Sequence, residues 1–202
     1  MKVTDINQLH QFIEQFNFAT LISHNNGELN VSHIPVTLHR NQGPHGTLTW
    51  HVAKQNPHSR EFDGIKTALC IFHGPHAYIS PSWYKSSPNV PTWNYAIARA
   101  SGIPKQVSKE QQSSDLSQMV TQHEGKSSYI IPDDYKLKLI DHIIGFRMEI
   151  TKIESTFKLG LNRSQEDQDG MIAGLLKQHN NEGLALAEFI QSIQKNHPAE
   201  NK

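Results

Sequence analysis

The chain has 202 residues, and its 19 basic and 19 acidic side chains give a formal net charge of zero. This balance lacks the basic excess that is typical of nucleic-acid-binding proteins, and the length is sufficient for a sizeable core without disulfides. The single cysteine, Cys70, excludes an internal disulfide; it stands in an apolar run, and we expect a buried, inert thiol in a reducing compartment. Because we find neither an apolar run of membrane-spanning length nor a signal-peptide pattern, we expect a cytoplasmic protein without a membrane partner.

Apolar periodicity in the first half predicts one helix followed by strands in hairpin order. The helix has Ile6, Leu9, Ile13 and Phe16 on one face, with Thr4 or Asp5 as its cap. The Asn25–Gly27 segment is a hairpin-turn signal, and Pro35 predicts a bulge or an edge within its strand. Asn56 and Pro57 predict the start of a short helix that ends near Gly64. The expected strands are 18–24, 29–39, 47–52, 67–72 paired with 76–80 around Gly74-Pro75, and 92–100.

The second half predicts mostly helices. Ser108–Gln111 and Ser164–Asp167 are capping boxes, and the first of them opens a helix that should stop at Gly125. A helix is expected from Pro132 to Gly145, followed by a strand in which Phe146, Met148 and Ile150 alternate. Two helices, about 165–179 and 182–196, should end the chain, with a frayed tail after His197. Together these elements predict a mainly β fold, an antiparallel barrel with added helices.

Aromatic residues and prolines are concentrated between Gly74 and Tyr95, where two of the three tryptophans lie. Such a stretch suits a surface that holds a planar ligand, but composition alone favours an aromatic corner of the core, because most buried aromatic side chains only pack. Gly74–Tyr84 reads Gly-Pro-His-Ala-Tyr-Ile-Ser-Pro-Ser-Trp-Tyr, and Val90–Tyr95 reads Val-Pro-Thr-Trp-Asn-Tyr. Together with Gly-Thr-Leu-Thr-Trp-His-Val-Ala-Lys-Gln-Asn-Pro at 46–57 and Phe-Lys-Leu-Gly-Leu-Asn-Arg at 157–163, these strings resemble the PaiB family, the FMN-binding negative transcriptional regulators.

The resemblance implies an FMN-binding split β-barrel of the pyridoxamine-phosphate-oxidase type, usually a homodimer with flavin at the interface. The resemblance runs from about Phe18 to about Leu176. Because the length suits one domain and we find no internal repeat or low-complexity linker, we expect the whole chain, 1–202, to form a single split-barrel domain. Residues 104–145 are then a helical insertion, and residues 164–197 are C-terminal helices packed on the barrel. DNA is a possible partner by resemblance only, since we identify no helix-turn-helix motif and no basic excess.

Flavin phosphate is expected at the turn from a strand into the short helix. Unpaired N–H groups at a helix start attract anions, and Lys54 would add a full charge. The alternative is a solvated lysine beside a capping asparagine. The resemblance favours the phosphate role, because related oxidases carry phosphate contacts at this turn. The residues concerned are His51, Val52, Ala53, Lys54 and Asn56.

Three further groups complete the predicted cofactor site. His33 and Thr37 lie at even spacing on one strand, where His33 either touches the flavin or bonds within the sheet. Thr92, Trp93, Asn94 and Tyr95 either bind the isoalloxazine ring or only pack two subunits together. Lys158, Asn162 and Arg163 either close the pocket or hold the anion. Here Gly160-Leu161 replaces the family's Ser-Gln, Arg99 replaces a common His, and Tyr129 stands near a usual Trp, so flavin retention is an open question.

The thirteen histidines also raise a metal hypothesis. His73 and His76 are the tightest pair, but no third ligand stands nearby in sequence, and we expect turn histidines and no metal. Two functions follow: an FMN-binding transcriptional regulator, or a flavin-dependent oxidoreductase on the same fold, with His76 and Tyr84 as guesses for its acid–base groups. A barrel that has lost its cofactor is a third hypothesis. Whether the chain is an enzyme stays open.

Overall fold

The computed structural model describes residues 3, 5–25, 27–62, 64–125 and 131–196. The chain forms two compact units. Thr4–His73 and Ala98–Glu154 make up the first, which we call the barrel unit. Met1–Val3, Gly74–Ile97 and Ser155–Lys202 make up the second, which we call the terminal unit. Three long strands contribute residues to both units: β5 (Ala68–Ile79), β6 (Thr92–Gln106) and β7 (Ile143–Lys158).

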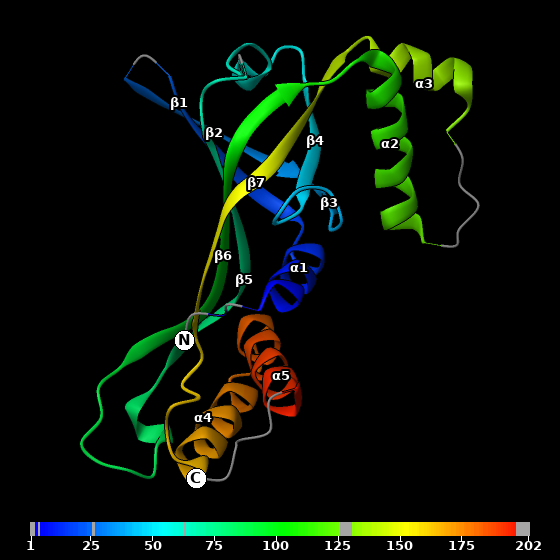
Figure 1. The fold of residues 1–202 in the computed structure, drawn as a ribbon. Helices are drawn as coiled ribbons and strands as arrows, with labels where there is room; N and C mark the ends of the chain where they lie inside the picture. Colours follow the sequence, from blue (N-terminus) through cyan, green and yellow to red (C-terminus); the bar gives the residue numbers. More distant parts are fainter. Residues whose placement is uncertain (1–2, 4, 26, 63, 126–130, 197–202) are drawn as a thin grey trace. The chain divides into compact units, whose positions relative to one another are not determined.

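A seven-stranded sheet with the order β2-β1-β5-β6-β7-β4-β3 organises the fold (Figure 1). Its remaining strands are β1 (Phe18–Asn25), β2 (Glu28–Pro35), β3 (Thr37–His39) and β4 (Thr47–Ala53). The pairs β1–β2, β1–β5, β3–β4 and β4–β7 are antiparallel, with registers such as Leu21↔Cys70 and Trp50↔Phe146. The mainly β fold class predicted from the sequence is confirmed.

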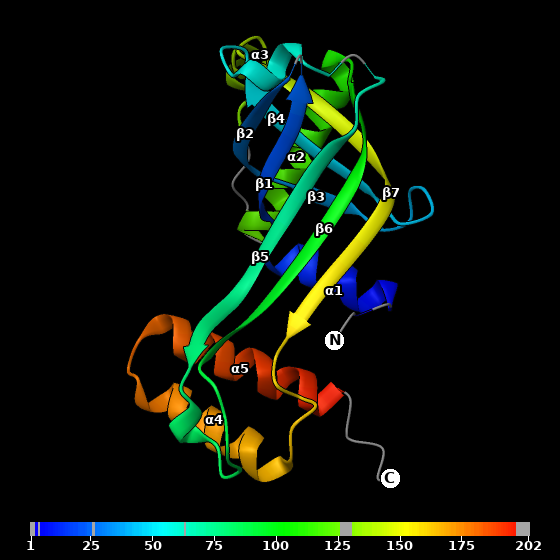
Figure 2. The ribbon, with the colours of Figure 1, turned by 90° about the vertical axis from the view of Figure 1, so that its left-hand side faces the viewer.

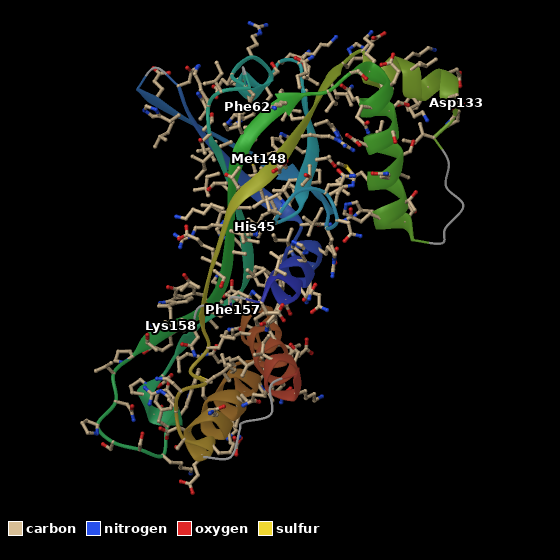
Figure 3. The ribbon with its side chains drawn as sticks, viewed as in Figure 1. His45, Phe62, Asp133, Met148, Phe157 and Lys158 are labelled. Carbon is tan, nitrogen blue, oxygen red and sulfur yellow. The ribbon has the colours of Figure 1, made fainter. Side chains whose placement is uncertain are left out.

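The barrel unit curves until the two ends of this strand order meet. β2 and β3 stand at opposite ends of the order, yet only Val36 separates them in the chain, and β2 contacts β4 directly. Strand alternation directs one set of side chains inward, among them Leu21, Trp50 and Phe146, each at most 2% exposed. Met148, labelled in Figure 3, belongs to the same set and is fully buried. This set forms the core of the unit.

Three helices accompany the barrel strands: α1 (Ile6–Gln15), α2 (Lys109–Glu124) and α3 (Asp133–Ile140). The Asp5 carboxylate caps α1 by accepting a hydrogen bond from the Asn7 N–H at 2.9 Å. α2 begins at its predicted cap Ser108, ends at Gly125, and contacts β3, β4 and α3. The Gln112 side chain attaches α2 to the sheet, because it accepts from the Gly145 N–H at 2.9 Å and donates to the Ile140 carbonyl at 3.1 Å.

The terminal unit combines strand ends with α4 (Gln165–Lys177) and α5 (Asn181–Asn196), which pack against each other (Figure 2). Ser164 caps α4 as the capping box predicts, accepting from the Asp167 N–H at 3.3 Å. Phe157 and Lys158, labelled in Figure 3, are neighbours at the end of β7 and therefore point to opposite faces of the strand. Phe157 is buried, with its ring centroid 5.7 Å from that of Phe189 in α5, whereas Lys158 is exposed.

Four predicted elements differ from the structure. The helix expected from Pro132 to Gly145 ends at Ile140, and strand β7 already begins at Ile143. The expected strand pair around Gly74-Pro75 is a single strand, β5, because β1 pairs only with Ala68–Phe72 and thus needs no N–H at Pro75. The expected strand 29–39 is broken at Val36 into β2 and β3. The helix expected to end near Gly64 is a four-residue 3₁₀ turn, η1 (Pro57–Arg60).

The predicted arrangement of domains remains a prediction. Helices α2 and α3 do fall within residues 104–145, and α4 and α5 fall within 164–197. The predicted frayed tail after His197 and the position of Tyr129 lie outside the described residues.

Candidate functional site

The turn after β4 offers less to an anion than its sequence suggests. A 3₁₀ turn of four residues has almost no dipole, and Pro57 has no N–H group to offer. The next two N–H groups are occupied, since His58 donates to the Asn56 side chain and Ser59 donates to the Asn56 carbonyl, both at 2.9 Å. Anion binding here would depend on the exposed side chain of Lys54. Its role in holding phosphate stays a prediction.

His51 and its neighbours differ in accessibility. His51 is half-buried, and burial lowers the pKa of its imidazole, so the neutral ring can exchange hydrogen bonds but carries no charge near pH 7. Val52 is buried in the barrel core, and its side chain cannot touch a ligand outside the barrel. Ala53 is exposed beside Lys54. Of the five residues predicted here, Ala53 and Lys54 therefore offer the most accessible surface.

A buried polar cluster stands behind this turn, and the sequence analysis did not identify it. The Ser32 hydroxyl lies 2.7 Å from His58 Nδ1 and accepts a hydrogen bond from the Asn56 amide at 2.9 Å. His58 is 1% exposed, and its Nε2 lies 3.9 Å from a carboxylate oxygen of Glu61, which in turn accepts from the Ser23 hydroxyl. No local pattern in the sequence indicates this cluster, because Ser32 and His58 stand 26 positions apart in the chain. This cluster fixes Asn56 as a structural group of the turn.

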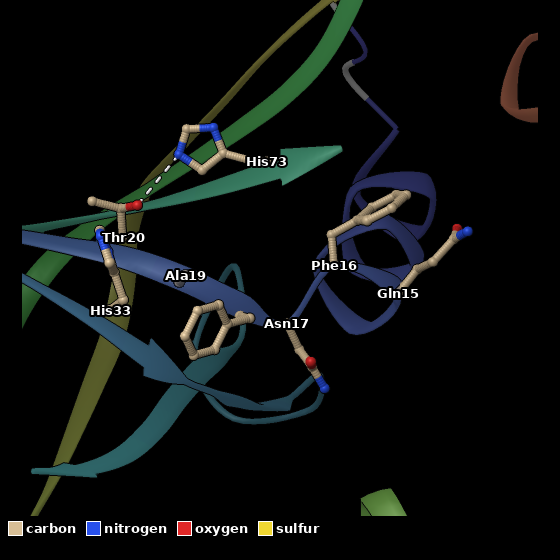
Figure 4. A pocket seen from close by; sticks show the side chains of 8 residues that line it. Gln15, Phe16, Asn17, Ala19, Thr20, His33 and His73 are labelled. Carbon is tan, nitrogen blue, oxygen red and sulfur yellow. Dashed lines mark hydrogen bonds between the residues drawn. The ribbon is translucent and has the colours of Figure 1, made fainter. Parts of the chain in front are cut away.

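His33 lines a shallow pocket in the barrel unit, of about 490 Å³, where α1 ends and β1 begins (Figure 4). Phe18 is 63% exposed there, and its ring centroid lies 6.4 Å from that of His33. The Thr20 hydroxyl lies 3.3 Å from Nε2 of His73, as the dashed line in Figure 4 marks. Aromatic rings and two imidazoles in one pocket can stack on a planar group and hydrogen-bond its edge. The lining residues are Gln15, Phe16, Asn17, Phe18, Ala19, Thr20, His33 and His73.

Thr37 does not share this pocket. It is 8% exposed, and its hydroxyl is buried without a hydrogen-bond partner among the described residues. The even spacing of His33 and Thr37 would place them on one face of a continuous strand, but the break at Val36 separates them. A flavin could reach the Thr37 hydroxyl only if the groups covering it moved.

The strand Thr92–Tyr95 divides its predicted ring contacts between two faces. Trp93 is 52% exposed, and its ring centroid lies 6.3 Å from those of His76 and Tyr78. Thr92 and Asn94 point to the opposite face, because side chains alternate along a strand. One flavin ring on this strand can therefore contact the aromatic face or the polar face of a given chain, but not both.

The polar face borders a pocket of about 380 Å³ within the terminal unit, which we call the terminal pocket. The Lys158 ammonium donates to the Thr92 hydroxyl, and the buried Asn94 amide donates to the sulfur of Met171 at 3.1 Å. This pocket brings together five of the predicted cofactor residues. Its lining is Tyr84, Val90, Thr92, Asn94, Lys158, Gly160, Asn162 and Arg163.

Arg163 is held in place on one side of the terminal pocket. Its guanidinium carbon lies 3.7 Å from the centre of the Tyr84 ring, and its Nη1 donates to Asn89 at 2.8 Å and to Asp167 at 3.5 Å. Asp167 also accepts from the Ser86 hydroxyl and from the backbone N–H groups of Ser86 and Lys85. These hydrogen bonds, first those from Ser86, lower the pKa of the Asp167 carboxyl, which therefore stays ionised at neutral pH.

The described residues also contain other reactive groups, among them a thiol. Cys70 is buried as expected, and burial raises the pKa of its thiol to about 12. Within the described part of the chain, no three His, Cys, Asp or Glu side chains are grouped so that they could hold a metal ion. In the same part, no helix is both long and apolar enough to cross a membrane. Arg99, which replaces a common family His, is exposed on β6.

Comparison with solved structures defines the class of protein. The FAD and heme binding protein from Mycobacterium smegmatis superposes with a TM-score of 0.62 at 11% identity, covering 83% of this chain and 78% of that one. The flavocytochrome Anf3 from Azotobacter vinelandii gives a TM-score of 0.61 at 12% identity, covering 83% of this chain and 74% of that one. The fold is the split barrel of flavin-binding proteins.

Sequence comparison then identifies the family. Residues 1–152 match the family model described as "Putative FMN-binding domain". The Bacillus subtilis protein called "Protease synthase and sporulation protein PAI 2" is 30% identical over 195 residues, which cover 94% of this chain and 93% of that protein. An uncharacterized protein from Emericella nidulans is 28% identical over 79% of this chain and 80% of its own length. The chain belongs to the PaiB family of FMN-binding proteins, and FMN is its cofactor.

The described residues fit the chemistry of FMN. A flavin needs an apolar planar surface, polar partners for its ring edge and a cation for its phosphate. The exposed rings of Phe18 and Trp93 supply planar surfaces, and His33 and Tyr95 lie on the same strand faces as these rings. Lys54 is an exposed cation. Bound FMN would supply a ring that accepts and donates electrons.

Proposed function

We propose that this FMN-binding protein acts as a negative regulator of transcription, as a homodimer in the cytoplasm. The observation that carries the proposal is the 30% identity, over 94% of this chain, to the Bacillus subtilis protein PAI 2, whose name refers to protease synthase and sporulation. A regulator of this kind would use FMN as a ligand or redox signal that changes its affinity for DNA or for a protein partner. The match to the FMN-binding family supports the part of this proposal in which FMN is the bound ligand.

The first test is a visible absorption spectrum of the full chain before and after loading with FMN and desalting. We expect a retained flavin band with vibronic structure, which is typical of a ring in a protein site. An empty protein after loading would contradict a resident cofactor, and it would leave a cofactor-independent binding role.

For the phosphate we propose Lys54. Lys54→Met should weaken FMN several-fold, because a charge-assisted hydrogen bond is worth about 1.5–3 kcal/mol before solvent screening. Riboflavin, which lacks the phosphate, should bind the variant and the parent equally. Lys105→Met, another exposed lysine of the barrel unit, is the matched control. Equal losses of FMN and riboflavin would exclude a phosphate contact for Lys54.

The regulatory role is tested by selecting duplexes from a random DNA pool. A net charge of zero makes non-specific binding weak, so a retained duplex must be recognised by its sequence. We expect the selected duplex to bind about 10³-fold more tightly than its shuffled version at physiological salt. The affinity should also differ between FMN-loaded and flavin-free protein.

Absence of any sequence preference in both forms would contradict direct DNA binding. The oxidoreductase alternative rests on the fold alone, which does not fix a function. Rapid turnover of a reduced nicotinamide cofactor by the FMN-loaded protein would favour the oxidoreductase over the regulator.

A further inference from the structure

The terminal pocket is lined by two cationic side chains. Lys158 and Arg163 both line it, and the anion Asp167 offsets one of their two charges at 3.5 Å from Arg163. One positive charge remains. A phosphate monoester carries about −1.5 to −2 at neutral pH, whereas a carboxylate carries a single negative charge. The charge of the pocket thus matches a monoanion better than it matches the phosphate of FMN.

Hydrogen-bond donors converge on the same pocket. Arg163 has five N–H donors, and its hydrogen bonds to Asn89 and Asp167 both come from Nη1. Lys158 has three donors and contributes one to the Thr92 hydroxyl. A guanidinium can bind a carboxylate through two parallel N–H···O bonds that fit its two oxygens, and an ammonium lining the same pocket adds a further donor.

The site is preformed. Tyr84 supports the guanidinium from one face at 3.7 Å, and Asp167 fixes one of its nitrogens. Asn94 is 2% exposed, and its hydrogen bond to Met171 orients the amide at the pocket wall. A group that is rigid before binding loses little conformational entropy on binding. An isolated exposed side chain lacks supporting contacts of this kind.

Nonpolar surface defines the rest of the ligand. Val90 and Gly160 line the pocket, and the neighbouring hollow of about 460 Å³ continues along Leu159 and Leu161. From this arrangement we infer that the terminal pocket binds a small organic acid, a monocarboxylate with an apolar or aromatic body, independently of FMN. Lys158 and Arg163 hold the carboxylate, and Asn162 lies at the rim. The inference concerns the terminal unit alone and goes beyond the proposed function.

The test uses benzoate as the probe and benzamide as its uncharged isostere. Titration calorimetry is run on the full chain, FMN-loaded and flavin-free, at one fixed ionic strength. We expect benzoate to bind both forms with the same affinity and benzamide to bind much more weakly. Lys158→Met should weaken the binding of benzoate about three- to tenfold, because it removes a charge-assisted hydrogen bond that solvent and salt partly screen. Lys152→Met, a 65% exposed lysine on the same strand β7, should leave the affinity unchanged.

A second variant distinguishes the loss of a ligand contact from misfolding. Asn162→Asp adds a negative charge at an exposed position of the rim, and it should repel benzoate while leaving benzamide unaffected. Equal binding of benzoate and benzamide, or equal effects of the Lys158 and Lys152 variants, would overturn the inference. Tighter binding of inorganic phosphate, or competition between FMN and benzoate, would overturn it too, by assigning the pocket to the flavin phosphate. If benzoate does not bind but the chain still retains FMN, this inference fails and the proposed function stands.

Discussion

Gly160 is one of the positions at which this chain departs from the family pattern, and its geometry favours the glycine. Its φ of +73° is in the left-handed region, and an added Cβ would lie 3.1 Å from the sulfur of Met171 and 3.3 Å from the Asn94 amide. A side chain there would strain the backbone and crowd the wall of the terminal pocket. In this chain the loss of the family serine is therefore a requirement of local packing.

We expect Gly160→Ala to lower the free energy of unfolding by about 1–3 kcal/mol, the sum of left-handed strain and crowding. Urea denaturation measures it. Gly27→Ala is the matched control, because Gly27 has a φ of +85° but no atom within 4 Å of the added Cβ. The Gly160 variant should lose more stability than the Gly27 variant. Equal losses would show that Met171 and Asn94 yield to the methyl group without cost.

His58 makes a second prediction at the scale of a residue. Burial lowers the pKa of His58 from its ordinary value of 6.5, so the folded protein takes up the proton less readily than the unfolded chain. Above about pH 6.5 His58 is neutral in both states, and its titration does not change the free energy of unfolding. As the pH falls from there toward the pKa of the folded state, the unfolded chain takes up the proton first and the free energy of unfolding decreases. Burial also lowers the pKa values of His39 and His51, which add to the slope.

The measurement is the urea midpoint at several values between pH 7.5 and pH 5.5. His58→Gln removes the titrating group and retains a polar side chain near Ser32, so the variant should lose less stability than the parent over this range. His24→Gln, at an exposed position of β1, should leave the slope of the parent unchanged. A His58 variant with the full parental slope would place the titration elsewhere.

At the scale of elements, α4 and η2 (Pro81–Trp83) pack through two glycines. A Cβ on Gly174 would lie 2.2 Å from the Trp83 ring, and one on Gly170 would lie 2.1 Å from the Trp83 carbonyl oxygen. One turn of helix separates these glycines, and the small pair forms a groove that holds the tryptophan. Trp83 therefore has a structural role in the terminal unit. This role agrees with the alternative that the aromatic stretch forms a corner of the core.

Gly174→Ala sets helix propensity against packing. Alanine should stabilise a helix by about 1 kcal/mol relative to glycine, whereas overpacking costs about 1–3 kcal/mol. Since the clash involves a ring and a helix backbone, we expect net destabilisation in urea unfolding. Ala173→Gly, at the exposed neighbouring position, measures propensity alone. A stabilised Gly174 variant would mean that Trp83 moves aside freely.

Local signals predicted helix starts well, but the helix ends expected near Gly64 and at Gly145 and the continuity of the strands were wrong. Ser108 and Ser164 open their helices and Gly125 closes one, because a cap acts within a single turn. Pro75 was expected to end a strand, but whether a missing N–H matters depends on which neighbour pairs there, and that is set by residues distant in sequence. The aromatic and polar faces at Trp93 and Asn94 follow from strand alternation, which was available from the sequence. The cluster of Ser32, His58 and Glu61 was not, because it joins segments through the fold.

At the scale of the whole molecule, the homodimer remains a prediction, and the barrel unit offers a surface for it. Leu29 and Val31 on β2 are 70% and 56% exposed, and Phe18 on β1 is 63% exposed. The register places Val31 opposite Ile22, which in turn pairs with Leu69 of β5. Val31, Ile22 and Leu69 thus form an apolar strip across three adjacent strands, which Leu29 extends along β2, whereas Thr20 and His33 separate Phe18 from it. Monomers rarely expose large apolar patches.

Val31→Lys should place a charge in the centre of this strip and shift the protein from dimer to monomer. Leu137→Lys, on the 65% exposed position of α3, should leave the assembly unchanged. Light scattering after size-exclusion chromatography gives both masses directly. A second copy is the expected occupant because a β-sheet face of Leu, Ile and Val excludes water best against its own kind. If the parent is monomeric at micromolar concentration, or if the Val31 variant remains a dimer, then the strip is not the contact between copies.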